Sequence, residues 1–302
     1  MKIVEDKLNK KRLYLFLAIV FIISWSLVAI IPLSGNKYGS QISLVILSVL
    51  MLIPALSSIL TRIITKEGFK NMYLEPRFKK NIKYYLIAYF MTNIFIILGA
   101  VVFFMIFPKT LDLNLSTFGE SLKSNGITID VKTIFIAQLL QGILIGPVIN
   151  IIFTLGEELG WRGYLLQKLS KECSIQKSII ISGVIWGIWH GPVIAMGHNY
   201  GLGYFGAPWG GILAMIVFCV VVSAFLSYMT FKTKSCIPAV LSHGMINGFA
   251  SFSTVFIAVP RVNPFIGPSP VGILGGVGFI VVGIICLIKI NKMDKEMEEI
   301  SI

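Results

Sequence analysis

The sequence predicts an all-α integral membrane protein with about eight transmembrane helices. Of its 302 residues, 56% are hydrophobic and 13% are charged, and the mean hydropathy is +0.84. An ordinary soluble domain has about a quarter of its residues charged. The segments between the apolar runs are too short to hold a soluble domain, so we expect residues 1–302 to form a single membrane domain.

Eight apolar runs approach the ~20 residues that a helix needs to cross a bilayer. They lie at residues 13–33, 42–63, 84–107, 134–155, 178–196, 211–231, 237–257 and 271–290. The first run is too long for the core of a signal peptide and is not followed by an A-x-A cleavage site, so we assign it to a transmembrane helix. Four prolines are expected to interrupt or open helices: Pro54, Pro147, Pro192 and Pro238.

The basic residues are distributed unequally between the two sides of this arrangement. Alternate loops and both termini carry 21 of the 26 Lys and Arg residues, which predicts that both termini are cytoplasmic. Cytoplasmic loops also explain the net charge of +12, so we expect no nucleic-acid partner. Residues 108–133 form the longest segment on the other side, and this segment either caps the domain or is disordered.

Two adjacent carboxylates and an arginine interrupt the fourth apolar region in the sequence T-L-G-E-E-L-G-W-R. Charged groups at membrane depth are costly unless they are paired or face a wet cavity, so they indicate a functional site. Glu158 and Arg162 are four residues apart and can pair along one helix face. Glu157 lies about 100° round the helix from Glu158 and is free to act elsewhere. The charge distribution places this cluster on the cytoplasmic side.

Two of the three histidines also fall inside apolar runs, each with a companion one helical turn away. Trp186 precedes His190 by four residues, and Asn247 follows His243 by four. Glu157 is suited to accept a proton from a water molecule that His190 orients. His243 and Asn247 are suited to donate hydrogen bonds to the oxyanion formed at a peptide carbonyl.

Other interpretations remain open for these residues. A glutamate and two histidines also form a possible zinc ligand set, although the H-E-x-x-H pattern is missing. Taken alone, the acidic pair and the arginine are compatible with an interfacial salt bridge. A single histidine within a span is compatible with a role in interhelical packing. A non-catalytic scaffold and a proton-coupled transporter are the rival functions. We expect Trp161, Trp186 and Trp189 to be packing or interface residues, and His198 to be a solvated or interfacial loop residue.

Taken in order, these motifs resemble those of the CAAX protease and bacteriocin-processing (CPBP) family of intramembrane endopeptidases, which includes the type II CAAX prenyl endopeptidases. The family motif E-E-x-x-x-R matches Glu157, Glu158 and Arg162, and H-x-x-x-N matches His243 and Asn247. The motif F-x-x-x-H matches His190, with a tryptophan in place of the phenylalanine. The resemblance spans about residues 156–248, the expected catalytic core, and the run at residues 54–62 is also similar.

The resemblance implies an eight-helix fold with a cytoplasm-facing catalytic cavity, and hydrolysis of a peptide bond in a membrane-associated or lipidated peptide. It leaves two mechanisms open, one with a single zinc ion and one without a cofactor. The Ile- and Lys-rich composition suggests a prokaryotic cell membrane, where peptide maturation, bacteriocin processing or self-immunity, and cleavage of membrane-bound regulators are plausible roles. Membrane lipids and the peptide are the expected partners, and the oligomeric state is not fixed by the sequence.

Overall fold

The computed structural model describes residues 2–300, and the side chains of residues 5–292. Within this part of the chain the secondary structure is helical, apart from one isolated antiparallel bridge between Leu111 and Ile257. Among the described residues, five helical segments are long and apolar enough to cross a membrane: Glu5–Leu33, Gln41–Ile64, Phe78–Ile106, Val131–Leu169 and Trp209–Thr233. The predicted all-α polytopic membrane fold is confirmed, and the count of eight spans stays a prediction.

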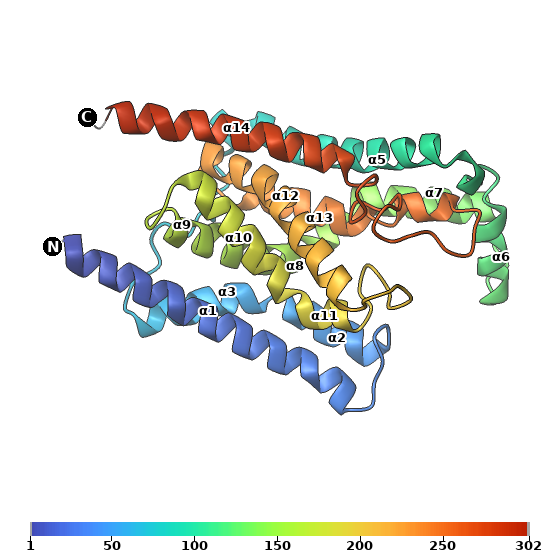
Figure 1. Ribbon diagram of the computed structural model, residues 1–302, viewed down its shortest axis with the longest axis horizontal. Helices are drawn as coiled ribbons and strands as arrows, with labels where there is room; N and C mark the ends of the chain where they lie inside the picture. The colour runs from blue at the N-terminus through green and yellow to red at the C-terminus, as the bar shows by residue number, and fades with distance from the viewer. Residues whose placement is uncertain (1, 301–302) are drawn as a thin grey trace.

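The helices lie roughly side by side along the long axis of the molecule (Figure 1). The first half of the chain contains α1 (Lys2–Leu33), α2 (Gln41–Leu50), α3 (Ile53–Ile64), α4 (Phe78–Leu86), the π-helical η1 (Ile87–Met91), α5 (Thr92–Ile106), the 3₁₀ turn η2 (Pro108–Thr110), α6 (Ser116–Ser124) and α7 (Val131–Leu140). The second half contains π-helical η3 (Gln141–Ile145), α8 (Gly146–Gly160), π-helical η4 (Trp161–Leu165), α9 (Leu166–Leu169), α10 (Ile175–Trp189), α11 (Gly191–Ala195), α12 (Trp209–Thr233), α13 (Ile237–Phe249), the 3₁₀ helix η5 (Phe252–Phe256) and α14 (Val277–Ile300).

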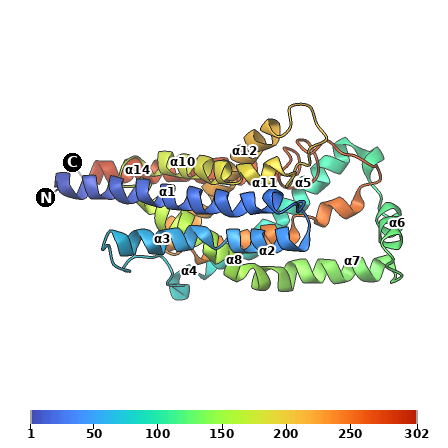
Figure 2. The same ribbon diagram turned by 90° about the horizontal axis from the view of Figure 1, so that it is seen from below.

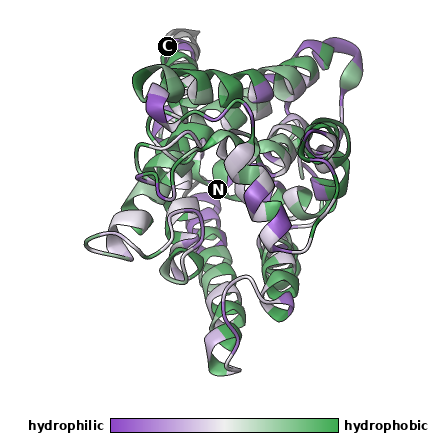
Figure 3. Cartoon of the chain, turned by 90° about the vertical axis from the view of Figure 1, so that its right-hand side faces the viewer, coloured by the Kyte–Doolittle hydropathy of each residue, from purple (hydrophilic) through white to green (hydrophobic). Residues whose placement is uncertain are grey.

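Four helices, α8, α10, α12 and α13, form the centre of the bundle. α8 packs along α13, α10 packs along α12, and α12 contacts α13, while α3 packs on α8 from one side. α1, α2 and α3 lie on one side of this centre, and α5 and α14 lie on the other (Figure 1). Figure 2 shows α7 and α8 continuing one another along one edge, and Figure 3 shows that the helices are mostly hydrophobic. The site residues therefore come from α8, α13 and the end of α10, which pack against one another or against α12.

Proline positions and loop structure bear out two of the sequence-based expectations. Pro54, Pro147, Pro192 and Pro238 each stand in the first turn of a helix, where a missing amide hydrogen costs little. Residues 108–133 are ordered: Asp112 N donates to Phe256 O at 2.8 Å, and Ala258 N donates to Thr110 O at 2.8 Å. This segment, with α6, covers the end of the bundle opposite the termini (Figure 1), so the alternative of disorder is wrong.

Both termini lie at the same end of the bundle (Figure 1). A chain that crosses the membrane an even number of times has both termini on the same side. The distribution of Lys and Arg residues predicted the same arrangement. The side of the membrane that this end faces stays a prediction.

Two glycines one turn apart bring α8 against the segment that joins α2 to α3. A Cβ atom on Gly156 would lie 2.6 Å from Met51 O, and one on Gly160 would lie 2.3 Å from the Cβ of Pro54. Small residues four apart allow transmembrane helices to approach closely. This contact fixes α8, and with it the acidic pair, against α3.

We expect Gly160→Ala to lower the melting temperature of the detergent-solubilised protein, because overpacking of this kind costs about 1–3 kcal/mol. The control is Gly191→Ala, where no atom lies within 4 Å of the added Cβ. Melting can be followed by size-exclusion chromatography after heating. Equal melting temperatures for the two variants would contradict the close contact.

Glu67, in the loop between α3 and α4, gathers three basic side chains at the end that holds the termini. It forms ion pairs with Arg12 at 3.4 Å, with Arg62 at 3.7 Å and with Lys168, and it accepts a hydrogen bond from Tyr164 Oη at 3.1 Å. Burial alone would raise the pKa of Glu67, but the hydrogen bond from Lys168 and the charges of Lys168, Arg62 and Arg12 lower it overall. The cluster ties α1, α3 and α9 together.

Because the folded-state pKa of Glu67 lies below its unfolded value of about 4.3, its contribution to stability is present above that pH and is lost as the pH falls through the folded-state pKa. We expect Glu67→Gln to be less stable than the wild type at pH 7, with the gap closing below about pH 4. Melting temperatures measured from pH 7 to pH 3 check this. Glu75→Gln, at a side chain 77% exposed, should show little difference at any pH, and a Glu67→Gln gap that persists in acid would contradict the ionic role.

Candidate active site

A buried ion pair lies at the centre of the site. Arg162 Nη1 donates to Glu158 Oε1 at 2.8 Å, and neither side chain has any exposed surface. Arg162 Nη2 also donates to Ser223 Oγ on α12 at 2.9 Å, and the guanidinium lies 4.3 Å from the centre of the Trp186 ring. The pairing predicted from the four-residue spacing is confirmed, and it holds α8 and η4 against α10 and α12.

His243 extends this pair onto α13. Its Nδ1 atom lies 2.8 Å from Glu158 Oε1. Because a carboxylate oxygen only accepts, Nδ1 carries a proton, and Nε2 is the remaining ring nitrogen. Asn247, one turn further on, is exposed, and its side chain has no hydrogen-bond partner among the described residues. Both side chains therefore retain hydrogen-bonding capacity.

Glu157 faces the other way and is held by two indole groups. Its Oε2 atom accepts from Trp186 Nε1 at 2.9 Å and from Trp161 Nε1 at 3.4 Å. The side chain is 3% exposed, and Oε1 has no partner among the described residues. The carboxylate is thus oriented through one oxygen, and the other is left for a ligand.

These two tryptophans correct the sequence interpretation, which treated them as packing residues. Trp186 contributes a donor from the position where the family motif usually has phenylalanine, and Trp161 follows Glu157 by one helical turn. For Trp161, the signal in the sequence was its position four residues after Glu157, which brings the indole N–H beside the carboxylate on one helix face. Trp189 donates to Ser24 Oγ at 2.7 Å and remains a packing residue against α1.

His190 terminates α10 and is fixed by its own helix. Its Nδ1 atom lies 2.8 Å from Trp186 O, so Nδ1 is the donor to this carbonyl and the other ring nitrogen, Nε2, is available as an acceptor. A hydrogen bond from one ring nitrogen to a backbone carbonyl sets both the tautomer and the ring orientation of a histidine.

One cavity of about 300 Å³ brings these groups together. Its lining includes Glu157, His190, His243 and Asn247, whereas Glu158 and Arg162 lie behind its wall. Four of the six predicted site residues thus face one space, and the other two support them. The lining continues to Val271 in the loop before α14. The side of the membrane to which the cavity opens stays a prediction.

His198, in the loop after α11, also lines this cavity, and its exposure is intermediate. Its interpretation as an interfacial loop residue stays a prediction. Its Nδ1 atom lies 2.6 Å from Tyr38 Oη, and burial lowers the pKa of His198 to about 4. The imidazole is therefore neutral at pH 7 and connects the loop after α11 to the loop after α1.

The zinc alternative can be tested on the donor set itself. Among the described side chains, no three His, Cys, Asp or Glu residues are grouped so that they could hold a metal ion. The bonds from His243 Nδ1 to Glu158 and from Glu157 Oε2 to two indoles leave His243 Nε2 and Glu157 Oε1 free, and bonds of this kind are also usual around histidine metal ligands. The spacing of the donors, rather than these bonds, is what does not fit a zinc site, and we derive no step through a metal.

Comparison with known proteins agrees with the motifs. Residues 132–249 match the family model described as type II CAAX prenyl endopeptidase Rce1-like. A protein from Methanococcus maripaludis named CAAX prenyl protease 2 is 34% identical over 93 residues, which is 30% of this chain and 34% of the relative. The aligned part therefore covers about a third of the curated relative. The resemblance to CAAX-type intramembrane proteases is confirmed for this segment.

The two acidic residues should respond differently to mutation. We expect Arg162→Ala to lower folded yield strongly, because it leaves Glu158 as an unpaired buried charge, at a cost of about 3–5 kcal/mol. Glu157→Gln should leave the yield near that of the wild type, since the amide oxygen can still accept from the indoles. Folded yield is measured by size-exclusion chromatography of the detergent-solubilised proteins, and equal losses in both variants would refute this division of roles.

Proposed function

We propose that the chain is an intramembrane endopeptidase that hydrolyses a peptide bond of a membrane-associated or lipidated peptide. The observation that carries the proposal is the Glu157 carboxylate, held by two indoles through Oε2 while Oε1 remains without a partner in a cavity shared with His190, His243 and Asn247. The family match over residues 132–249 and the printed name of the relative support a protease.

In the first step, water attacks the peptide carbonyl carbon while Glu157 accepts its proton. The acceptor nitrogen of His190 orients the water from the other side of the cavity, because its donor nitrogen is occupied by Trp186 O. The carbonyl π-electrons move to oxygen and form a tetrahedral oxyanion. The geometry requires no covalent enzyme intermediate.

Asn247 and His243 supply the hydrogen bonds that the oxyanion needs. The Asn247 amide has no other partner among the described residues. Donation from His243 Nε2 requires the doubly protonated imidazole, whose positive charge Glu158 stabilises through Nδ1. A donor of this kind typically contributes about 10²- to 10³-fold to kcat.

In the second step, the oxyanion collapses and the C–N bond breaks. Glu157 returns its proton to the leaving nitrogen, so that one water is consumed and two peptides, one with a new carboxyl group and one with a new amine, are released. Because the reaction site lies inside an apolar bundle, the substrate would reach it from the membrane, which favours membrane-anchored peptides over soluble ones.

The direct test is mass-spectrometric detection of cleavage by the purified protein against a library of lipidated and membrane-anchored peptides. We expect cleavage by the wild type, a loss of about 10²- to 10⁴-fold in Glu157→Gln, and wild-type activity in the control Glu75→Gln, whose carboxylate is exposed and far along the chain.

Cleavage that survives in Glu157→Gln would exclude Glu157 as the base. A library left intact by the wild type, together with a cellular phenotype that is the same for wild type and Glu157→Gln, would favour the alternative of a non-catalytic scaffold or self-immunity protein.

A further inference from the structure

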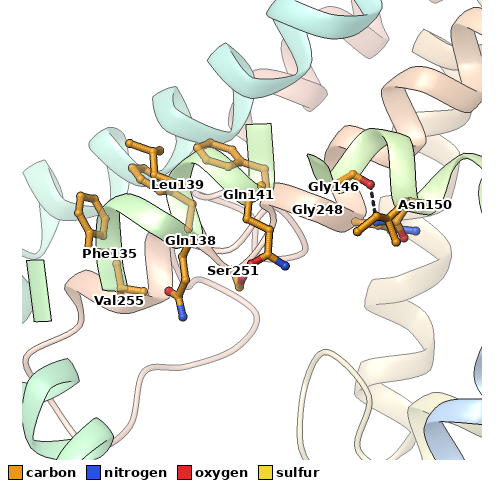
Figure 4. A pocket seen from close by; sticks show the side chains of 14 residues that line it. Phe135, Gln138, Leu139, Gln141, Gly146, Asn150, Gly248, Ser251 and Val255 are labelled. Carbon is orange, nitrogen blue, oxygen red and sulfur yellow. Dashed lines mark hydrogen bonds between the residues drawn. The ribbon is translucent and has the colours of Figure 1, made fainter. Parts of the chain in front are cut away.

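A second cavity of about 360 Å³ lies beside the catalytic cavity, and Asn247 lines both. One wall is formed by α7, η3 and the start of α8, and the other by the end of α13 and by η5. We call this cavity the flanking groove. Figure 4 shows Gln138 and Gln141 projecting from the same helical segment toward the same side of the groove. The groove thus begins at a predicted oxyanion donor and runs away from it.

Several polar side chains of the groove have no partner within the protein. Gln138, Gln141, Asn247 and Ser251 are exposed, and none of their side chains forms a hydrogen bond among the described residues. Asn150 is different, because its amide donates to Gly146 O at 2.8 Å.

The two glutamines belong to the span Val131–Leu169, where neighbouring exposed residues such as Ile136, Leu140 and Leu144 are apolar. Leaving an amide without a hydrogen bond in an apolar medium costs several kcal/mol. Two such amides on one side of a membrane helix indicate a surface that receives a polar ligand, whereas the apolar neighbours indicate contact with lipid.

Backbone contacts shape the floor of the groove. A Cβ atom on Gly142 would lie 2.8 Å from Gly248 O, and one on Gly146 would lie 3.1 Å from the Cα of Gly248. The segment Gln141–Ile145 is π-helical, a local widening that is frequent at functional sites. The Oη of Tyr89 donates to Ile143 O at 2.9 Å. The helices therefore touch through their backbones, and the larger side chains are displaced to the rim.

The length of the groove suits an extended peptide. Phe135 and Gly146 are eleven residues apart on a nearly continuous helical segment, or about 16 Å along its axis. At ~3.3 Å per residue, this distance corresponds to about five residues of extended chain. Amide and hydroxyl side chains match the alternating N–H and C=O groups of such a chain, whereas an acyl chain offers them no hydrogen bond.

We propose that the flanking groove is a substrate subsite, in which Gln138, Gln141 and Ser251 hydrogen-bond to the extended backbone on one side of the scissile peptide bond. This inference rests on the proposed endopeptidase function. It identifies the substrate class as a polypeptide with about four or five extended residues beside the cleavage point, rather than a short terminal fragment.

Photo-crosslinking in the inactive Glu157→Gln protein tests this directly. Benzoylphenylalanine replaces Phe135 in the flanking groove or Phe218 in the catalytic cavity, and the probe is a library of synthetic acylated decapeptides in detergent micelles. We expect peptide capture at both positions. Adding Gln138→Leu and Gln141→Leu should reduce capture at position 135 by about tenfold, the loss expected for two amide hydrogen bonds.

The control is Ile136→Leu with Leu144→Ile, two exposed positions of the same helical segment that do not line the groove, and it should leave capture unchanged. Size-exclusion profiles establish that every variant is folded. Three outcomes would overturn the subsite and leave the proposed hydrolysis standing. They are capture at position 218 without capture at position 135, capture at position 135 that Gln138→Leu and Gln141→Leu do not reduce, and capture of lipid alone at position 135. With peptides that the wild type cleaves, an absence of capture at both positions would overturn the subsite together with the placement of the substrate in the catalytic cavity.

Discussion

The ion pair between Glu158 and Arg162 is the constraint on which the rest of the site depends. Two fully buried charges in an apolar bundle are tolerated only when each is neutralised and hydrogen-bonded. Arg162 therefore also reaches Ser223, and Glu158 also accepts from His243. These contacts join α8 and η4 to α12 and α13, so that the requirement to pair a charge in the membrane determines how three helices are assembled.

The pair also decides what its neighbour can do. Adjacent residues on a helix point about 100° apart, so fixing Glu158 toward α12 and α13 directs Glu157 toward α10. There it meets the indole of Trp186, and the same tryptophan covers the guanidinium of Arg162 with its ring face. One side chain thus separates a structural carboxylate from a reactive one. The two adjacent glutamates have different roles because their surroundings differ.

Local spacing explains which parts of this arrangement were predictable. The four-residue separations placed Arg162 beside Glu158, and His243 and Asn247 on one face, because a helix brings such residues together whatever surrounds it. The contact between His243 and Glu158 joins residues 85 positions apart, and the placement of His198 in the cavity depends on how a loop folds back. Neither follows from periodicity. The π-helical segments were also invisible, since an extra residue in one turn leaves no mark in an apolar sequence.

The cost of unpaired polar groups in a membrane distinguishes Glu67 from the polar residues around the two cavities. Glu67 forms ion pairs with three basic side chains and accepts a hydrogen bond from a tyrosine hydroxyl, so its charge is neutralised within the fold. Glu157 keeps one free oxygen, and Gln138 and Gln141 have no protein partner among the described residues. Groups satisfied internally stabilise the fold, whereas groups that stay unsatisfied around connected cavities retain their binding capacity for another molecule. Asn247 lines both cavities, so the oxyanion donor and the peptide subsite would act on the same stretch of substrate.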